Sequence, residues 1–167
     1  MDLAWLADGA LALTYRLHGD LDRLRLPAGQ GAGLADGLWQ HSCFELFVGL
    51  AGDPGYREFN FSPAGQWAAY AFSDYRQRAV CVLPDAAPLI SVSSLGDRLE
   101  MTVRLAPTFL SPLPSSGTFE LGLSAVIEAT DGALAYWALA HPAERPDFHR
   151  REAFALHMTA PVSESCP

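Results

Sequence analysis

Alternation of apolar and polar residues with a period of two is the feature that most constrains the fold of this chain. It is clearest in Leu11–His18, Arg98–Leu105 and Phe119–Glu128, where Val126 is the one exception. Because successive side chains of a β-strand point to opposite faces, each segment predicts a strand with one face in a core and the other toward solvent or a ligand. The sequence has no apolar stripe with the 3.6-residue period of a long amphipathic helix.

Turn residues separate these segments at short intervals. Gly96-Asp97 and Asp131-Gly132 lie between predicted strands and indicate hairpins. The proline- and serine-rich segment Pro107–Gly117 is predicted to cross from one sheet to the other, and a last strand is predicted at Phe154–Met158. Short strands with this spacing are typical of sandwiches. The sequence therefore predicts an all-β fold, an antiparallel immunoglobulin-like β-sandwich with residues 1–167 in a single domain.

The charge of the chain argues against several classes of partner and mechanism. Its formal net charge is -8, and all 11 of its cationic residues are arginine. Nucleic acids and anionic membranes bind clustered cations, so neither is an expected partner. Without lysine, Schiff-base catalysis and a phosphate-binding loop of the Walker type are excluded.

The two ends of the chain and its cysteines indicate the compartment. Met1–Trp5 lacks the positive and apolar regions of a signal peptide, and no apolar run approaches the ~20 residues of a membrane-spanning helix. Cys43, Cys81 and Cys166 are too few for a disulfide framework or a zinc site. We therefore expect a cytoplasmic protein with three free thiols, of which Cys166, in a polar tail, is the most reactive.

The segment Leu38–Val48 contains the first candidate site residues, Trp39 and Glu45. Read as a strand, it places Glu45 on one face with largely apolar neighbours, where an unpaired charge is costly. Two interpretations stay open. Glu45 is either buried and paired with an arginine, for which Arg16 and Arg104 are the leading candidates, or it contacts a ligand.

Two further segments combine aromatic and polar side chains. In Tyr56–Tyr70, Glu58, Asn60 and Ser62 share the face opposite Phe59 and Phe61, and a turn leads into a strand that carries Trp67 and Tyr70. In the second segment, Tyr136–His149, the prominent residues are Trp137 and His141. Planar aromatics with fixed polar groups suit a sugar. His141, His149 and Asp147 lack the spacing of a metal site, and no GxSxG motif supports a serine nucleophile.

Three segments carry a resemblance to a known family: Leu38–Gly49, Tyr56–Phe72 and Tyr136–Phe154. Together they resemble the DOMON-like bacterial proteins, a group similar to carbohydrate-binding module family nine and to the haem-binding DOMON domains. The resemblance implies a β-sandwich with a pocket on one sheet or its loops. It also implies haem as an alternative ligand, for which Met101, Met158, His18 and His141 are the available axial residues, although Met101 falls on a predicted core face.

We therefore predict a non-catalytic module that binds a small molecule, with a carbohydrate as the expected ligand, and that needs no cofactor. The alternatives are a haem-binding or electron-transfer domain and a protein-interaction module. The predicted ligand-binding residues are four stacking aromatics and four polar partners: Trp39, Trp67, Tyr70 and Trp137, with Glu45, Asn60, Arg76 and His141.

Overall fold

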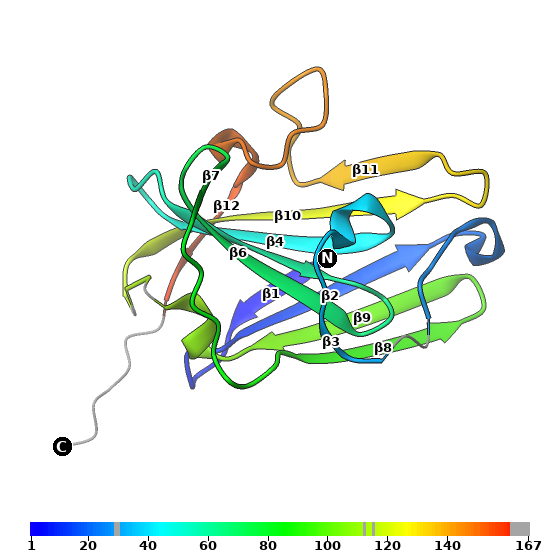
Figure 1. The fold of residues 1–167 in the computed structure, drawn as a ribbon, viewed down its shortest axis with the longest axis horizontal. Coiled ribbons are helices and arrows are strands. Elements are labelled where there is room, and N and C mark those ends of the chain that lie inside the picture. Colours follow the sequence, from blue (N-terminus) through cyan, green and yellow to red (C-terminus); the bar gives the residue numbers. More distant parts are fainter. Residues whose placement is uncertain (29–30, 112, 115, 161–167) are drawn as a thin grey trace.

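The computed structural model describes residues 1–28, 31–111, 113–114 and 116–160, and in this part of the chain two β-sheets pack face to face (Figure 1). The four-stranded sheet has the order β1-β2-β9-β8, with bounds Asp2–Trp5, Leu11–His18, Arg98–Leu105 and Leu89–Leu95. The larger sheet has the order β11-β10-β4-β5-β6-β3, with bounds Leu134–Ala138, Thr118–Glu128, Cys43–Leu50, Tyr56–Phe61, Gln66–Asp74 and Gly33–Leu34.

Two short strands extend the larger sheet, and four single-turn helices connect the strands. β7 (Gln77–Ala79) pairs with β6, and β12 (Leu156–Thr159) pairs with β10. The 3-10 helices are η1 to η4, with bounds Leu21–Arg23, Leu38–Gln40, Pro107–Leu110 and Arg151–Ala153. None of the helices in the described ranges is long and apolar enough to cross a membrane.

The predicted β-sandwich is confirmed, and the strands with the strongest alternation are confirmed with it. β2, β9 and β10 occupy the predicted segments, Gly96-Asp97 and Asp131-Gly132 turn between paired strands, and the chain changes sheet between β9 and β10. The sheets are antiparallel except for the short parallel pair β3–β6. Two strands begin later than predicted. Residues 38–40 form η2, so β4 begins only at Cys43, and β12 begins at Leu156 rather than Phe154, after η4.

The core between the sheets is formed by the inward-facing half of each alternating strand. Phe44, Leu46 and Val48 of β4 are fully buried there, and Tyr15 of β2 donates its hydroxyl to the backbone carbonyl of Glu45 at 2.9 Å. Each large side chain buried in this way stabilises the fold by about 1.5–3 kcal/mol. This layer fixes β4, and it therefore also fixes the side chains that β4 presents on its outer face.

A second, smaller apolar cluster lies on the outer face of the larger sheet. It consists of Phe47, Tyr56, Phe72, Ala153 and Phe154. The last two belong to the segment between β11 and β12, which folds back over the sheet (Figure 1). The segment between β11 and β12 therefore covers one end of the outer face of the larger sheet. The pocket described below lies beside this segment.

Cys43 and Cys81 are free, and Cys166 lies outside the described residues. Cys43 is buried in β4, as its apolar sequence context predicts. Cys81 lies two residues beyond the end of β7 rather than within a strand, and it accepts a hydrogen bond from the Arg57 guanidinium.

Candidate ligand-binding site

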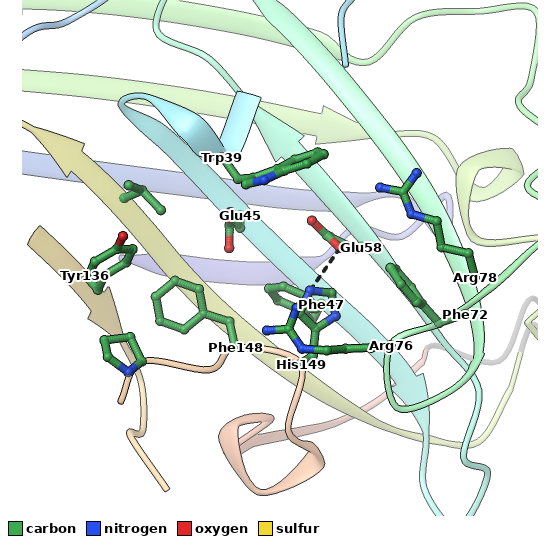
Figure 2. A pocket seen from close by; sticks show the side chains of 12 residues that line it. Trp39, Glu45, Phe47, Glu58, Phe72, Arg76, Arg78, Tyr136, Phe148 and His149 are labelled. Atoms are coloured by element: carbon green, nitrogen blue, oxygen red, sulfur yellow. Dashed lines mark ion pairs between the residues drawn. The ribbon is translucent and has the colours of Figure 1, made fainter. Parts of the chain in front are cut away.

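A cavity of about 430 Å³ opens on the outer face of the larger sheet. Figure 2 shows Glu45 and Glu58 beside each other at its base, with Trp39 on one side and Phe148 and His149 on the other. The volume lies within the range of small-molecule sites. Twelve residues line the cavity: Trp39, Glu45, Phe47, Glu58, Phe72, Arg76, Arg78, Val126, Tyr136, Pro146, Phe148 and His149.

Strand register brings the two carboxyl groups together at the base of the cavity. In one row across the sheet, Glu45 of β4 lies between Ser124 of β10 and Asn60 of β5. In the neighbouring row on the same face, Glu58 lies beside Phe47. Outward-facing residues on adjacent strands are close when they are opposite or diagonal, so Glu45 and Glu58 are neighbours.

Glu45 is buried, as predicted, but the predicted arginine partner is wrong. Its side chain is only 3 % exposed, and its Oε2 accepts one hydrogen bond, from the Ser124 hydroxyl at 2.9 Å. Arg16 instead pairs with Asp2 and Glu100, and Arg104 pairs with Asp8. Both arginines project from the outer face of the four-stranded sheet, whereas Glu45 projects from the far face of the other sheet. The core separates them.

The burial of the two acids changes their protonation. Loss of water and the nearby charge of Glu58 raise the pKa of Glu45 from 4.5 to about 8, against the opposing effect of the Ser124 hydrogen bond. Glu58 is 5 % exposed, and burial raises its pKa to about 7, although the Asn60 amide and the charges of Arg78 and Arg76 oppose this. At neutral pH the free site therefore holds a mostly protonated Glu45 beside a partly ionised Glu58.

His149 is held in its neutral form next to Glu58. The hydroxyl oxygen of Tyr56 accepts a hydrogen bond from the backbone N–H of Arg76 at 3.1 Å. The hydroxyl group of Tyr56 in turn donates its hydrogen to Nδ1 of His149 at 2.8 Å. This assigns the hydrogen of the ring to Nε2, which lies 3.7 Å from Oε2 of Glu58. Burial, followed by the charge of Arg76, lowers the pKa of His149 to about 4.

Asp147 joins the β6–β7 turn to the segment that carries His149. Its carboxylate accepts hydrogen bonds from the Tyr75 hydroxyl at 2.6 Å, the Arg76 guanidinium at 2.9 Å and the His149 backbone N–H at 3.3 Å. Arg76 has a φ of 54°, in the left-handed region that non-glycine residues seldom adopt. The side chain of Arg76 at the cavity is therefore fixed both by the turn and by its ion pair with Asp147.

Aromatic rings form the walls. Trp39 reaches the cavity from η2 and meets Tyr70 edge to face, with ring centroids 5.7 Å apart. The Arg78 guanidinium lies over the Tyr70 ring at 4.5 Å. On the opposite wall, Tyr136 of β11 and Phe148 have their centroids 6.2 Å apart. Planar rings on two sides of a polar base are the arrangement in which a flat or ring-shaped ligand stacks.

The structure brings three of the eight predicted site residues into the cavity lining: Trp39, Glu45 and Arg76. Two others support it from outside the lining. Asn60 is buried and donates its amide to Glu58 at 2.8 Å, and Tyr70 contacts Trp39 and donates its hydroxyl to Asp36 at 2.5 Å.

The other three predicted residues lie elsewhere. Trp67 is 4 % exposed and packs on Phe109 in the core between the sheets, because its position in β6 faces inward. Trp137 is 60 % exposed on the edge strand β11, on the face opposite Tyr136. His141 lies in the following loop, where its ring is 6.1 Å from that of Phe148, and it does not line the cavity.

Sequence reasoning did not select five chemically important lining residues: Glu58, Arg78, Tyr136, Phe148 and His149. A signal existed for Glu58, since alternation places it on the face of Asn60, and for Tyr136, since it opposes Trp137. Phe148 and His149 belong to an irregular segment whose position depends on contacts with distant strands. No pattern in that segment alone indicates that it folds over β4 and β5.

No group of three His, Cys, Asp or Glu side chains suitable for a metal ion occurs within the described ranges. Met101 is buried in the core, Met158 packs against the same core, and neither lines the cavity.

Comparisons with known proteins give one informative likeness. No family model matches the chain, and no curated protein matches its sequence. A solved structure from Bacteroides uniformis, provisionally described as a carbohydrate-binding protein, superposes with a TM-score of 0.54 at 15 % sequence identity. The match covers 91 % of this chain and 72 % of that one, and it supports the β-sandwich fold.

Proposed function

We propose that this protein is a non-catalytic binding module whose ligand, a carbohydrate of one or two sugar units, occupies the cavity between Trp39 and Phe148. The observation that carries the proposal is the pair of buried carboxyl groups, Glu45 and Glu58, which face the cavity with few protein partners. Hydroxyl groups of a sugar are suited to complete their hydrogen bonding.

The walls favour a sugar over the other ligand classes. Sugar rings present C–H faces that stack on aromatic side chains, and Trp39, Tyr136 and Phe148 offer such surfaces. A Met–His haem site is disfavoured, because both candidate methionines pack on the core and neither lines the cavity. The likeness to a protein provisionally described as carbohydrate-binding agrees with this choice.

Binding should be tested with a panel of mono- and disaccharides that includes neutral, amine-bearing and acidic members. Titration calorimetry would compare the wild type with Trp39→Ala and Trp137→Ala. Both variants remove an exposed tryptophan from the larger sheet region, but only Trp39 lines the cavity. We expect Trp39→Ala to weaken binding by about fivefold or more, since truncation of an aromatic anchor in a binding site costs more than about 1 kcal/mol. Trp137→Ala should bind as the wild type does.

Two outcomes would contradict the proposal. Equal weakening by both substitutions would place the ligand outside the cavity. Failure of every sugar in the panel to bind would exclude a carbohydrate ligand of these classes and favour a protein-interaction module. Chromatography of the bound sugar after prolonged incubation tests the non-catalytic part, because any new product would reveal an enzyme.

A further inference from the structure

Glu45 is a buried acid without a cation. Within the described residues its hydrogen-bond partner is the neutral Ser124 hydroxyl, and no arginine or histidine forms an ion pair with it. In the part of the chain that the structure describes, Glu58 has only the neutral His149 at 3.7 Å and the Asn60 amide as side-chain partners. Buried carboxylates are normally paired, because an isolated charge in an apolar environment is costly.

The cations near the cavity do not fill this role. Arg76 is paired with Asp147 at 2.9 Å and is held there by the β6–β7 turn. Arg78 lies over the Tyr70 ring, on the side of the cavity away from Glu45, and forms no ion pair with either acid within the described ranges (Figure 2). Two adjacent acids therefore face the cavity together while the nearest guanidinium groups are engaged elsewhere.

Around the acids, the remaining lining is largely aromatic. Trp39, Phe47, Tyr136 and Phe148 present rings to the same space. A ring face attracts a cation through its quadrupole, and the attraction grows where water is displaced. Carboxyl groups at the base and aromatic rings on the walls form the combination that recognises an organic ammonium group.

We infer that the ligand carries a protonated amine that lies against Glu45 and Glu58, so that the preferred ligand is an amino sugar rather than a neutral or acidic one. This inference rests on the proposed function, since it names the chemical class of the sugar in the same cavity. Binding of the ammonium group supplies the missing cation, and the proton carried by Glu45 in the free protein passes to the buffer when that carboxyl group ionises.

A matched set of disaccharides tests the inference. Chitobiose with free amines, its di-N-acetylated form and cellobiose share one linked ring skeleton and differ in the group at the second carbon. Calorimetry at pH 6.5 should find the free-amine form bound about tenfold tighter than the other two. Glu45→Gln and Glu58→Gln should each remove that preference, while Glu100→Gln, which alters a half-buried acid on the other sheet, should preserve it. Thermal unfolding of each variant establishes that it is folded.

The outcomes separate the two proposals. If cellobiose or the acetylated form binds as tightly as the free amine, the amino-sugar inference fails and the carbohydrate function stands. The inference also fails if Glu45→Gln and Glu58→Gln, both folded, keep the preference for the amine. If no member of the set or of the wider panel binds, the carbohydrate function fails and the inference fails with it.

Discussion

At the scale of single residues, Glu45 and Glu58 link the stability of the protein to pH. A folded-state pKa above the usual 4.5 means that the folded chain holds its proton more tightly than the unfolded chain does. The protonated acids therefore contribute to the free energy of unfolding in full below about pH 4.5. This contribution is lost as pH rises toward 7 for Glu58 and toward 8 for Glu45. The contribution of His149 to the free energy of unfolding instead rises between about pH 4 and 6.5, because the pKa of its ring is lowered in the folded protein.

We therefore predict that the free energy of unfolding falls between pH 6.5 and 8.5, a window above the range of His149. The expected loss is about 3 kcal/mol, roughly two thirds of it from Glu45. Urea unfolding of the wild type and Glu45→Gln at both pH values measures it, with the slopes compared to verify similar unfolded states. The Gln variant should lose less than half as much. An equal loss in the two proteins would show that Glu45 does not hold a proton in the fold.

The contrast between Glu45 and the tryptophans shows how far single residues could be read from the sequence. The alternation in β4 was enough to predict that Glu45 is buried on a face with Cys43 and Phe47. Its supposed arginine partner was wrong because sequence does not tell which sheet face an arginine on another strand occupies. Trp67 and Trp39 look alike as aromatic residues, yet one faces the core and the other projects from a short helix onto the outer face.

At the scale of elements, Asp147 connects the β6–β7 turn to the segment between β11 and β12. Its carboxylate accepts three hydrogen bonds across this contact. We predict that Asp147→Ala lowers the free energy of unfolding by about 1–3 kcal/mol, since bonds to a charged acceptor are lost. Hydrogen exchange should rise in a peptide covering the β6–β7 turn, because the Tyr75 and Arg76 side chains of that turn would lose their hydrogen bonds to Asp147.

A second turn supplies the control for this substitution. Asp53 accepts a backbone N–H from Gly55 at 2.8 Å, but it is exposed, and its side chain bonds to no distant segment among the described residues. Asp53→Ala should therefore cost less than about 1 kcal/mol and leave exchange at the β6–β7 turn unchanged. Equal effects of the two substitutions would mean that Asp147 is an ordinary turn residue.

The outer face of β4 also depends on a glycine that leaves room for an arginine. A Cβ at Gly49 would lie 1.6 Å from Nη1 of Arg151. Nη2 of the same arginine donates hydrogen bonds to the backbone oxygen of Leu50 at 2.9 Å and to the carboxylate of Glu120 at 2.5 Å. We predict that Gly49→Ala destabilises the protein by about 1–3 kcal/mol, because Arg151 must move. In an Arg151→Ala background the same change should cost about 1 kcal/mol less. Denaturant unfolding of the four proteins measures this coupling, and strict additivity would contradict it.

The strands that the sequence predicted well are those whose two faces differ most. β2, β9 and β10 each have a buried and a more polar face, so their periodicity identifies them. β3 and β7 are two and three residues long, too short to show a period, and β11 is exposed on both faces at an edge. The segment between β11 and β12 is irregular, and its position over the sheet follows from packing of Phe154 and His149 on Phe47. Those contacts join residues about a hundred positions apart.

At the scale of the whole molecule, the two sheets enclose one core, and β4 lies between β10 and β5 near the middle of the larger sheet. Its side chains therefore contact both the core and the outer cavity. Cys43, at the start of β4, is fully buried, and burial holds the pKa of its thiol well above the usual range. The thiol lies on the outer face of β4, and a thiolate-directed reagent can reach it only when the residues that cover that face move away.

We predict that alkylation of Cys43 reports the global unfolding of the protein. Cys43 has no exposed surface, and we expect the segments that cover the outer face at the start of β4 to unfold together with the two sheets. With a typical domain stability, labelling of Cys43 should be slower than that of an unfolded thiol by a factor on the order of 10⁴ or more. Cys81, which is half-buried beyond β7, should react much faster. Peptide mapping by mass spectrometry measures both rates in increasing urea. The free energy obtained from Cys43 should match the value from equilibrium unfolding, and a clearly lower value would show that the cover over the start of β4 opens without the rest of the sandwich.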